Sequence, residues 1–101
     1  MTAHVIFTQL DNKNPVTHSK KLIEIIRRKI GFKNILISDD LSMKSLKGNL
    51  KDNLFRTFNA GCNIALHCNG NFKEMEIVGK NSPLIDKFIF KKTSQFYKIL
   101  S

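Results

Sequence analysis

The chain has 101 residues, the size of one domain or part of one, which excludes an autonomous (β/α)8 barrel of about 250 residues. Its apolar fraction of 42% is typical of globular proteins, and two cysteines are too few for a disulfide scaffold. We expect no secretory signal and no transmembrane helix, which needs roughly 20 apolar residues. We therefore expect a cytoplasmic location. The net charge of +9 is spread from Lys13 to Lys98, and we interpret it as a solvated surface rather than a nucleic-acid interface.

Strands and helices are predicted to alternate along the chain. A first short strand is expected around the apolar residues 5–7. Ser19 can cap a helix over residues 20–30, where apolar residues recur with the three-to-four spacing of one buried face. Gly31 then suits the left-handed position that follows a helix. Residues 34–38 form an isoleucine-rich run that predicts a second strand, buried on both faces.

The second half of the chain repeats this pattern. After a polar loop over residues 39–48, a helix is predicted from about Asn49 to Ala60, with Gly61 at its end. Residues 64–68 predict a third strand. Asn71 can cap a short helix that ends at Gly79.

A last helix is predicted over residues 84–100, with Ser82 as its N-cap and Pro83 at its first position. This helix is basic and amphipathic, and we expect it to cover a sheet rather than to touch a membrane. Three strands that alternate with helices predict an α/β fold of parallel βα units.

Ligands of parallel α/β sheets sit at the carboxyl ends of the strands. The second strand ends at Asp39 and Asp40, and the third ends at His67, Cys68 and Asn69. Two adjacent carboxylates after an apolar strand are costly unless they have partners or a task. Strand alternation sends them to opposite sides, so we expect one to face a site and the other to be tied into the scaffold.

Each histidine and cysteine has either a structural role or a role in a site. Cys62, His67 and Cys68 match no standard zinc spacing, and we expect buried thiols and no metal. For His4, in the first strand, we expect packing or a structural hydrogen bond. His67 is expected to line a pocket. The chain has no P-loop, no other Gly-rich phosphate loop and no nucleophile elbow.

Three stretches together resemble the bacterial β-N-acetylhexosaminidases of glycoside hydrolase family 3. They are residues 1–7 (MTAHVIF), residues 31–43 (GFKNILISDDLSM) and residues 59–69 (NAGCNIALHCN). The second stretch is the most specific, because its Gly-Phe start, apolar strand and SDDLSM end recur in that family. The order and spacing of the stretches also match, and the resemblance reaches about Pro83.

The resemblance implies a cytosolic, cofactor-free enzyme with a (β/α)8-like barrel, of which this chain resembles the last three βα units. Such enzymes release terminal N-acetylglucosamine from peptidoglycan fragments in cell-wall recycling, with retention, through a covalent glycosyl-enzyme intermediate. It implies that Asp39 is the nucleophile, that Asp40 and His4 support it, and that Met43, His67 and Asn69 lie near the sugar.

The resemblance also implies that further segments of the barrel complete the site. The family's K-H-F-P-G-H-G segment and its His–Asp acid/base pair have no counterpart in residues 1–101. Only His4 and His67 could replace that proton donor here, and the other acids fall in turns or helices away from the strand ends. We therefore expect the C-terminal part of a family 3 catalytic domain, which acts together with an N-terminal half of the same barrel.

Two alternatives stay open from the sequence. One is a non-catalytic remnant or partner subunit that binds a sugar or an N-terminal half without hydrolysis. The other is a small basic nucleic-acid-binding protein, which only the net charge supports.

Overall fold

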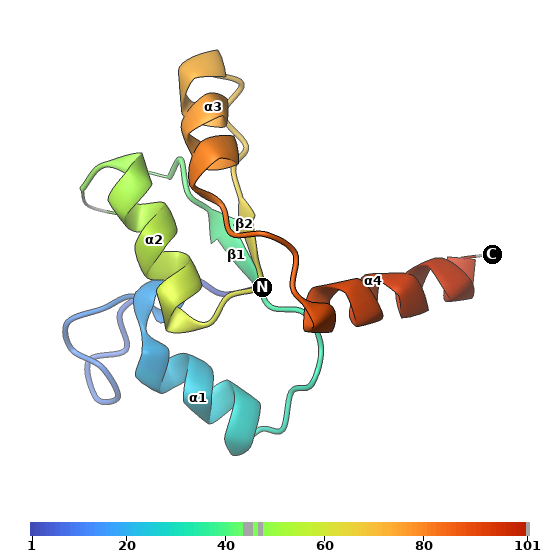
Figure 1. Cartoon of the computed structure of the whole chain (residues 1–101). Helices are drawn as coiled ribbons and strands as arrows, with labels where there is room; N and C mark the ends of the chain where they lie inside the picture. Colours follow the sequence, from blue (N-terminus) through green and yellow to red (C-terminus); the bar gives the residue numbers. More distant parts are fainter. Residues whose placement is uncertain (44–45, 47, 101) are drawn as a thin grey trace.

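The computed structural model describes residues 1–43, 46 and 48–100, and shows an α/β fold around a small parallel sheet (Figure 1). Strand β1 (Ile37–Asp40) pairs with strand β2 (Ile64–Leu66). The predicted α/β class with parallel strands is confirmed, although β1 starts three residues later than expected and β2 ends two residues earlier. Of the predicted loop over residues 39–48, residues 44, 45 and 47 lie outside the described residues.

Side-chain caps start three of the helices where the sequence predicts them. Ser19 accepts a hydrogen bond from the backbone N–H of Leu22 at 3.1 Å and begins α1 (Lys20–Arg28). Asn49 caps α2 (Leu50–Ala60) and Asn71 caps α3 (Phe72–Asn81) in the same way. These caps supply acceptors for N–H groups that have no partner inside the helix.

The ends of the helices are less well predicted than their starts. Gly61 follows α2 in the left-handed region, with φ of +119°, as expected. Gly31 is also left-handed, at φ +76°, but α1 has already ended at Arg28. Helix α3 continues through Gly79 to Asn81, because an isolated glycine lowers helix stability without being enough to end a helix.

Helix α2 is the centre of the packing. It contacts α1, α3, strand β2 and the short 3-10 helix η1 (Val16–His18). Two buried apolar clusters hold these elements together. One joins α1 to the chain around the strands through Ile23, Leu36, Ala60 and Cys62, and the other lies under the loop after β1 and contains Leu41, Leu46 and Leu54.

The predicted first strand is wrong. Residues 1–7 run beside β1 but form only one backbone hydrogen bond to it, from the N–H of Thr2 to the carbonyl of Ile37 at 2.8 Å. The other backbone bonds of this segment come from Val16 and Thr17 and, at the turn that follows Phe7, from Leu10 and Asp11. Without a ladder of bonds to a neighbouring strand, an extended segment does not become part of a sheet.

The last helix also differs from the prediction. Helix α4 spans Lys87–Leu100 and therefore starts three residues late, and Ser82 does not cap it. Instead Ser82 ends α3, where its hydroxyl donates to the carbonyl of Val78 at 2.6 Å. Helix α4 projects away from the other helices and buries none of its residues (Figure 1). Its expected role as a cover for the sheet is therefore not seen.

Candidate functional site

The site predicted from the sequence lies at the carboxyl edge of the two strands. Asp40 at the end of β1 is opposite Leu66 at the end of β2, and Ile37 is opposite Ile64. Three steps along β1 thus match two along β2, so β1 carries a bulge at residues 38–39. The buried Ser38 side chain fills the gap by accepting a hydrogen bond from the N–H of Leu66 at 2.9 Å. Bulges often redirect side chains next to functional sites.

The carboxylate of Asp40 is fully engaged. Its Oδ1 accepts hydrogen bonds from the backbone N–H groups of Ser42 at 3.0 Å and of Cys68 at 2.9 Å. Its Oδ2 accepts from the Ser42 hydroxyl at 2.7 Å. Asp40 therefore joins the loop after β1 to the loop after β2.

These contacts also set the charge of Asp40. Burial acts to raise the pKa of this carboxyl, but the hydrogen bonds from Ser42 and Cys68 and the neighbouring His67 outweigh it and hold the pKa below its ordinary value. Asp40 is an anion at neutral pH with a structural task.

The carboxylate of Asp39 is used differently. It is half-buried, and its Oδ1 accepts a hydrogen bond from the N–H of Asp40 at 2.8 Å. Within the described part of the chain, no donor reaches its second oxygen. The two adjacent acids thus have separate partners, as the sequence predicts, and only Asp39 keeps an uncommitted oxygen at the edge of the sheet.

His4 supports the backbone of this edge. The imidazole is 9% exposed, and its Nε2 donates to the carbonyl of Asp40 at 2.7 Å. Its Nδ1 lies 2.9 Å from the hydroxyl of Thr17. The expected structural hydrogen bond of His4 is confirmed, but His4 lies in an irregular segment and not in a strand.

His67 and Asn69 are brought to the same edge and held by an acid that the sequence analysis missed. Glu74 lies in the first turn of α3. Its Oε1 is 3.4 Å from Nε2 of His67, and its Oε2 accepts a hydrogen bond from the side-chain amide of Asn69 at 3.0 Å. The expectation that the remaining acids lie away from the strand ends is therefore wrong for Glu74. The spacing of Asn71 and Glu74, typical of a capping box, is the signal that places Glu74 beside this loop.

Met43 completes the edge. Its backbone N–H donates to the carbonyl of Asp40 at 3.2 Å, and its side chain is 43% exposed. The structure thus brings Asp39, Asp40, His4, Met43, His67 and Asn69 together. Among them, Asp39 has a carboxylate oxygen without a donor in the described residues and Met43 an exposed thioether, whereas the exposed amide of Asn69 donates to Glu74 and accepts from the N–H of Asn71.

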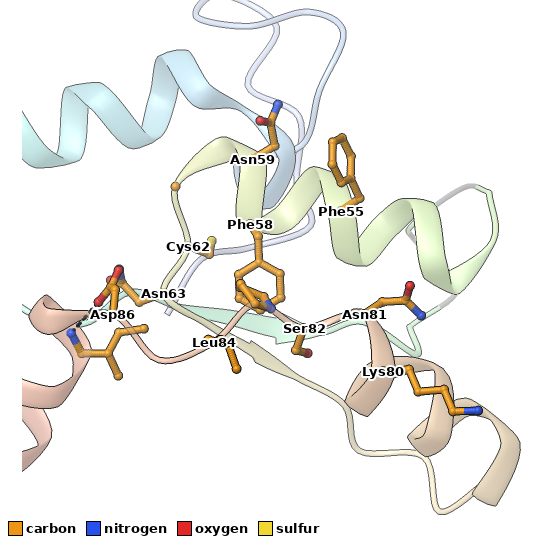
Figure 2. A pocket seen from close by; sticks show the side chains of 13 residues that line it. Phe55, Phe58, Asn59, Cys62, Asn63, Lys80, Asn81, Ser82, Leu84 and Asp86 are labelled. Carbon is orange, nitrogen blue, oxygen red and sulfur yellow. Dashed lines mark hydrogen bonds between the residues drawn. The ribbon is translucent and has the colours of Figure 1, made fainter.

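A wider hollow lies at the opposite end of β2. It has a volume of about 850 Å³ and lies between Phe55 and Phe58 of α2 and the segment from Lys80 to Asp86 (Figure 2). Its floor includes Cys62 and Asn63, which precede β2. Because it is remote from the carboxyl edge, its size does not make it the candidate for the chemistry of Asp39.

Comparison with known proteins gives a consistent result. The model of the glycosyl hydrolase family 3 N-terminal domain matches residues 1–89. A β-hexosaminidase of Neisseria meningitidis serogroup C is 44% identical over 71 residues, which are 68% of this chain and 20% of that protein. A β-hexosaminidase of Haemophilus influenzae is 36% identical over 90 residues, which are 82% of this chain and 26% of that protein.

A solved structure of a relative also resembles the fold of this chain. NagZ from Neisseria gonorrhoeae, in complex with N-trifluoroacetyl-D-glucosamine, superposes with a TM-score of 0.74 at 34% identity. The match covers 93% of this chain and 27% of that one. The chain thus spans about a quarter of the length of the relatives it matches.

None of the helices in the described residues combines the length and apolarity needed to cross a membrane. The family match covers most of the chain, the relatives agree with it, and the fold superposes on part of a solved relative. The chain therefore belongs to the glycosyl hydrolase family 3 N-terminal domain family and is a homologue of the β-hexosaminidases.

Proposed function

We propose that residues 1–101 form the C-terminal part of the catalytic domain of a cytoplasmic β-N-acetylhexosaminidase. In this proposal β1 and β2 belong to the last βα units of a (β/α)8 barrel, and the remaining strands come from an N-terminal half of that barrel. The family match, the β-hexosaminidase relatives and the matched quarter of a larger solved structure support it. The enzyme would remove terminal N-acetylglucosamine from muropeptides during cell-wall recycling.

The observation that carries the proposal is the contrast between Asp39 and Asp40. Asp40 accepts three hydrogen bonds and fixes the loops, whereas Asp39, at the end of a parallel strand, has one carboxylate oxygen that no donor in residues 1–43, 46 and 48–100 reaches. A nucleophile in a retaining glycosidase needs this combination of a fixed backbone and an available oxygen.

The proposed reaction has two steps. A carboxylate oxygen of Asp39 attacks the anomeric carbon of N-acetylglucosamine, and the bond from that carbon to the leaving oxygen breaks. The leaving oxygen takes a proton from a donor in the N-terminal half of the barrel. Water then attacks the same carbon while the deprotonated donor takes a proton from it; the bond from the carbon to Asp39 breaks, which releases the sugar with retained configuration and restores the carboxylate. The step needs no cofactor.

The other residues of the edge have supporting roles in this proposal. Asp40 and His4 hold the strand end that carries Asp39. Met43 and Asn69 lie at the rim, where they would contact the sugar, and His67 shapes the loop beside it. The solved relative binds N-trifluoroacetyl-D-glucosamine, which is an analogue of the proposed product.

A chimeric enzyme tests the assignment of Asp39. Residues 1–89 would replace the matching segment of the Neisseria gonorrhoeae relative, and turnover of a chromogenic β-N-acetylglucosaminide would be followed. Asp39→Asn should lower kcat at least about a thousandfold, because the nucleophile is lost. Glu76→Gln, which changes an exposed acid on α3 by the same chemistry, should leave turnover unchanged. Ordinary turnover by the Asp39→Asn chimera would overturn the proposal.

A second candidate function is binding without hydrolysis. It is favoured by one observation: the histidines of the edge are both engaged, His4 with Thr17 and Asp40 and His67 with Glu74. Neither is poised as a proton donor within the described residues. If a matching N-terminal half were mixed with this chain, stable assembly and sugar binding without turnover would favour this candidate. Turnover that appears on mixing would reject it.

A further inference from the structure

Helix α4 carries an apolar row that no described part of the chain covers. Phe90 and Tyr97 are seven residues apart, which places them on the same side of the helix, and they are 68% and 69% exposed. Ile85, which precedes the helix, is also exposed and lines a hollow together with Phe90 and Lys87. We call Ile85, Phe90 and Tyr97 the outer row of α4. Large apolar side chains that gather on a surface indicate an interaction site.

The outer row faces away from the sheet. Phe96 and Ile99 lie on another side of α4 and line a hollow of about 550 Å³ with residues of both strands, among them Ile37 and Ile64. An α-helix has about 3.6 residues per turn, so the outer-row residues of the helix lie nearly opposite the side that lines this hollow. A segment that extends or covers the sheet would therefore meet α4 at the hollow and leave the outer row exposed.

Most of α4 also lies outside the part of the chain that the family model describes. That model ends at residue 89, whereas the helix spans Lys87–Leu100 and projects away from the other helices (Figure 1). The helix buries none of its described residues. The outer row is therefore available for a contact outside the domain.

Lysines border the outer row. The sequence of α4, KFIFKKTSQFYKIL, contains four lysines and no acid. Lys87, Lys91 and Lys98 are spaced by four and seven residues and form a row of their own, next to the outer row. The acid before the helix, Asp86, is engaged with the backbone, because its carboxylate accepts a hydrogen bond from the N–H of Ile89 at 2.8 Å. The exposed apolar row is thus flanked by positive charge.

We propose that the outer row and the lysines beside it bind the surface of a membrane that contains anionic lipids. Aromatic rings insert at the boundary between the headgroups and the acyl chains, and neighbouring lysines attract the anionic headgroups. The 14 residues of α4 span about 20 Å, which is too short to cross a bilayer, so the helix would lie along the surface.

The pattern favours a membrane over an acidic protein. The outer row belongs to a projecting helix, so a protein partner would have to supply a groove that fits it, with acids placed opposite the lysines. A fluid lipid surface provides apolar chains and negative charge without a matching shape. The proposal does not rest on the hydrolase function, because none of its residues belongs to the carboxyl edge.

The test is co-sedimentation of the whole chain with vesicles of phosphatidylcholine, either alone or mixed with phosphatidylserine. The partition coefficient should be at least about tenfold higher for the mixed vesicles, because each lysine near an anionic surface strengthens binding about fivefold. Added salt should lower the coefficient for the mixed vesicles, since salt screens this attraction.

Paired lysine variants show whether the charges of α4 are responsible. Lys87→Gln combined with Lys91→Gln should weaken binding to the mixed vesicles at least about tenfold. Lys20→Gln combined with Lys21→Gln is the matched control, because it removes the same charge from exposed positions on α1. The control should weaken binding much less.

A second pair of variants tests the aromatic row. Phe90→Ser should weaken binding about tenfold, because a ring that inserts into the membrane is lost. Phe55→Ser removes an equally exposed ring from α2 and should leave binding unchanged. Circular dichroism shows whether each variant is folded. Should Phe90→Ser not fold, the lysine variants decide alone, because their side chains are exposed.

The outcomes separate this surface from general attraction to a basic protein. Binding to the mixed vesicles that the α4 variants lose and the controls keep would support the proposal. No binding to the mixed vesicles, equal binding to both kinds of vesicle, or equal losses in variants and controls would overturn it.

Other occupants of the outer row give distinct results. A dimer that Phe90→Ser dissociates in sedimentation equilibrium, without binding to vesicles, would assign the row to a second copy and overturn the proposal. A chimera with residues 1–101 behind the N-terminal half of the Neisseria gonorrhoeae relative should also bind the mixed vesicles. Failure of this chimera to bind would mean that the N-terminal half covers the row, and would likewise overturn the proposal.

Discussion

Replacement of Asp40 by alanine should destabilise the protein strongly, whereas the same change at Asp39 should not. Asp40→Ala removes three hydrogen bonds, two from Ser42 and one from the N–H of Cys68. At about 1 kcal/mol each, they contribute about 3 kcal/mol to the free energy of unfolding. That is a large share of the roughly 5–15 kcal/mol of a whole domain, and corresponds to a fall in Tm of about 12–24 °C.

Two variants calibrate this expectation. Asp39→Ala removes one local hydrogen bond, to the N–H of Asp40, and should cost less than about 1 kcal/mol. Asp40→Asn keeps one acceptor oxygen for the two N–H donors, and its amide can donate to the Ser42 hydroxyl, so it should also cost about 1 kcal/mol. Urea unfolding followed by far-ultraviolet circular dichroism gives the three values.

The pH dependence provides an independent check. The pKa of Asp40 in the folded protein is below its ordinary value of 3.8, so the unfolded chain binds this proton first as the pH falls. The contribution of its charge is therefore complete above about pH 4 and is lost as the pH falls through the folded pKa. Equal destabilisation by Asp39→Ala and Asp40→Ala at neutral pH would refute the division of roles between these acids.

Three further predictions concern the scaffold that positions the site. Leu54→Ala should cost about 2–5 kcal/mol in urea unfolding, because Leu54 is fully buried, whereas Phe55→Ala, 69% exposed on the same helix, should change stability much less. Gly61→Ala should destabilise by more than about 1 kcal/mol, since φ is +119° and a new Cβ would lie 2.9 Å from the Ile23 side chain. Gly79→Ala, inside α3 with open space around it, should leave Tm unchanged or raise it; equal losses at the two glycines would contradict this account. Ser19→Ala should lower the free energy of unfolding by about 1 kcal/mol, because the cap of α1 is lost. In an NMR titration of this variant, the pKa of Asp11 should rise from about 2 toward 3.8, because the Ser19 hydroxyl gives the strongest of the hydrogen bonds that lower it. An unchanged pKa would refute this.

Local signals predicted the parts of the fold that local chemistry decides. The caps at Ser19 and Asn71 and the left-handed Gly61 each satisfy backbone groups within a few residues, so the sequence is sufficient to place them. Asn49, expected only as the approximate first residue of its helix, is in fact the N-cap of α2. The carboxyl ends of β1 and β2 could be predicted because each follows an apolar run of strand length, and Asp39 and Asp40 come directly after the first run.

The errors arise where a distant partner decides the conformation. Residues 5–7 have strand-forming side chains but no neighbouring ladder, and Val5, Ile6 and Phe7 remain about half exposed. Ser82 is followed by proline, which suggests an N-cap, yet its hydroxyl finds the carbonyl of Val78 in the preceding helix.

The site was predicted in part for the same reason. Strand alternation predicts different surroundings for Asp39 and Asp40. Their hydrogen-bond partners do differ, but β1 carries a bulge between Ile37 and Asp40, and the site role of Asp39 stays a prediction. Glu74 was missed because its contacts with His67 and Asn69 depend on how α3 folds back beside the loop after β2. That geometry is a tertiary property, and only the capping spacing of Asn71 and Glu74 hints at it.

The measurement that tests the central claim most directly is the identification of the residue that becomes glycosylated. The chimeric enzyme with residues 1–89 of this chain would be treated with an activated 5-fluoro derivative of N-acetylglucosamine, which forms the covalent intermediate faster than it is released. Peptide mapping by mass spectrometry should place the sugar on Asp39 and on no other carboxylate. A label on Asp40 or Glu74, or turnover without any covalent label, would contradict the assignment of Asp39 as the nucleophile.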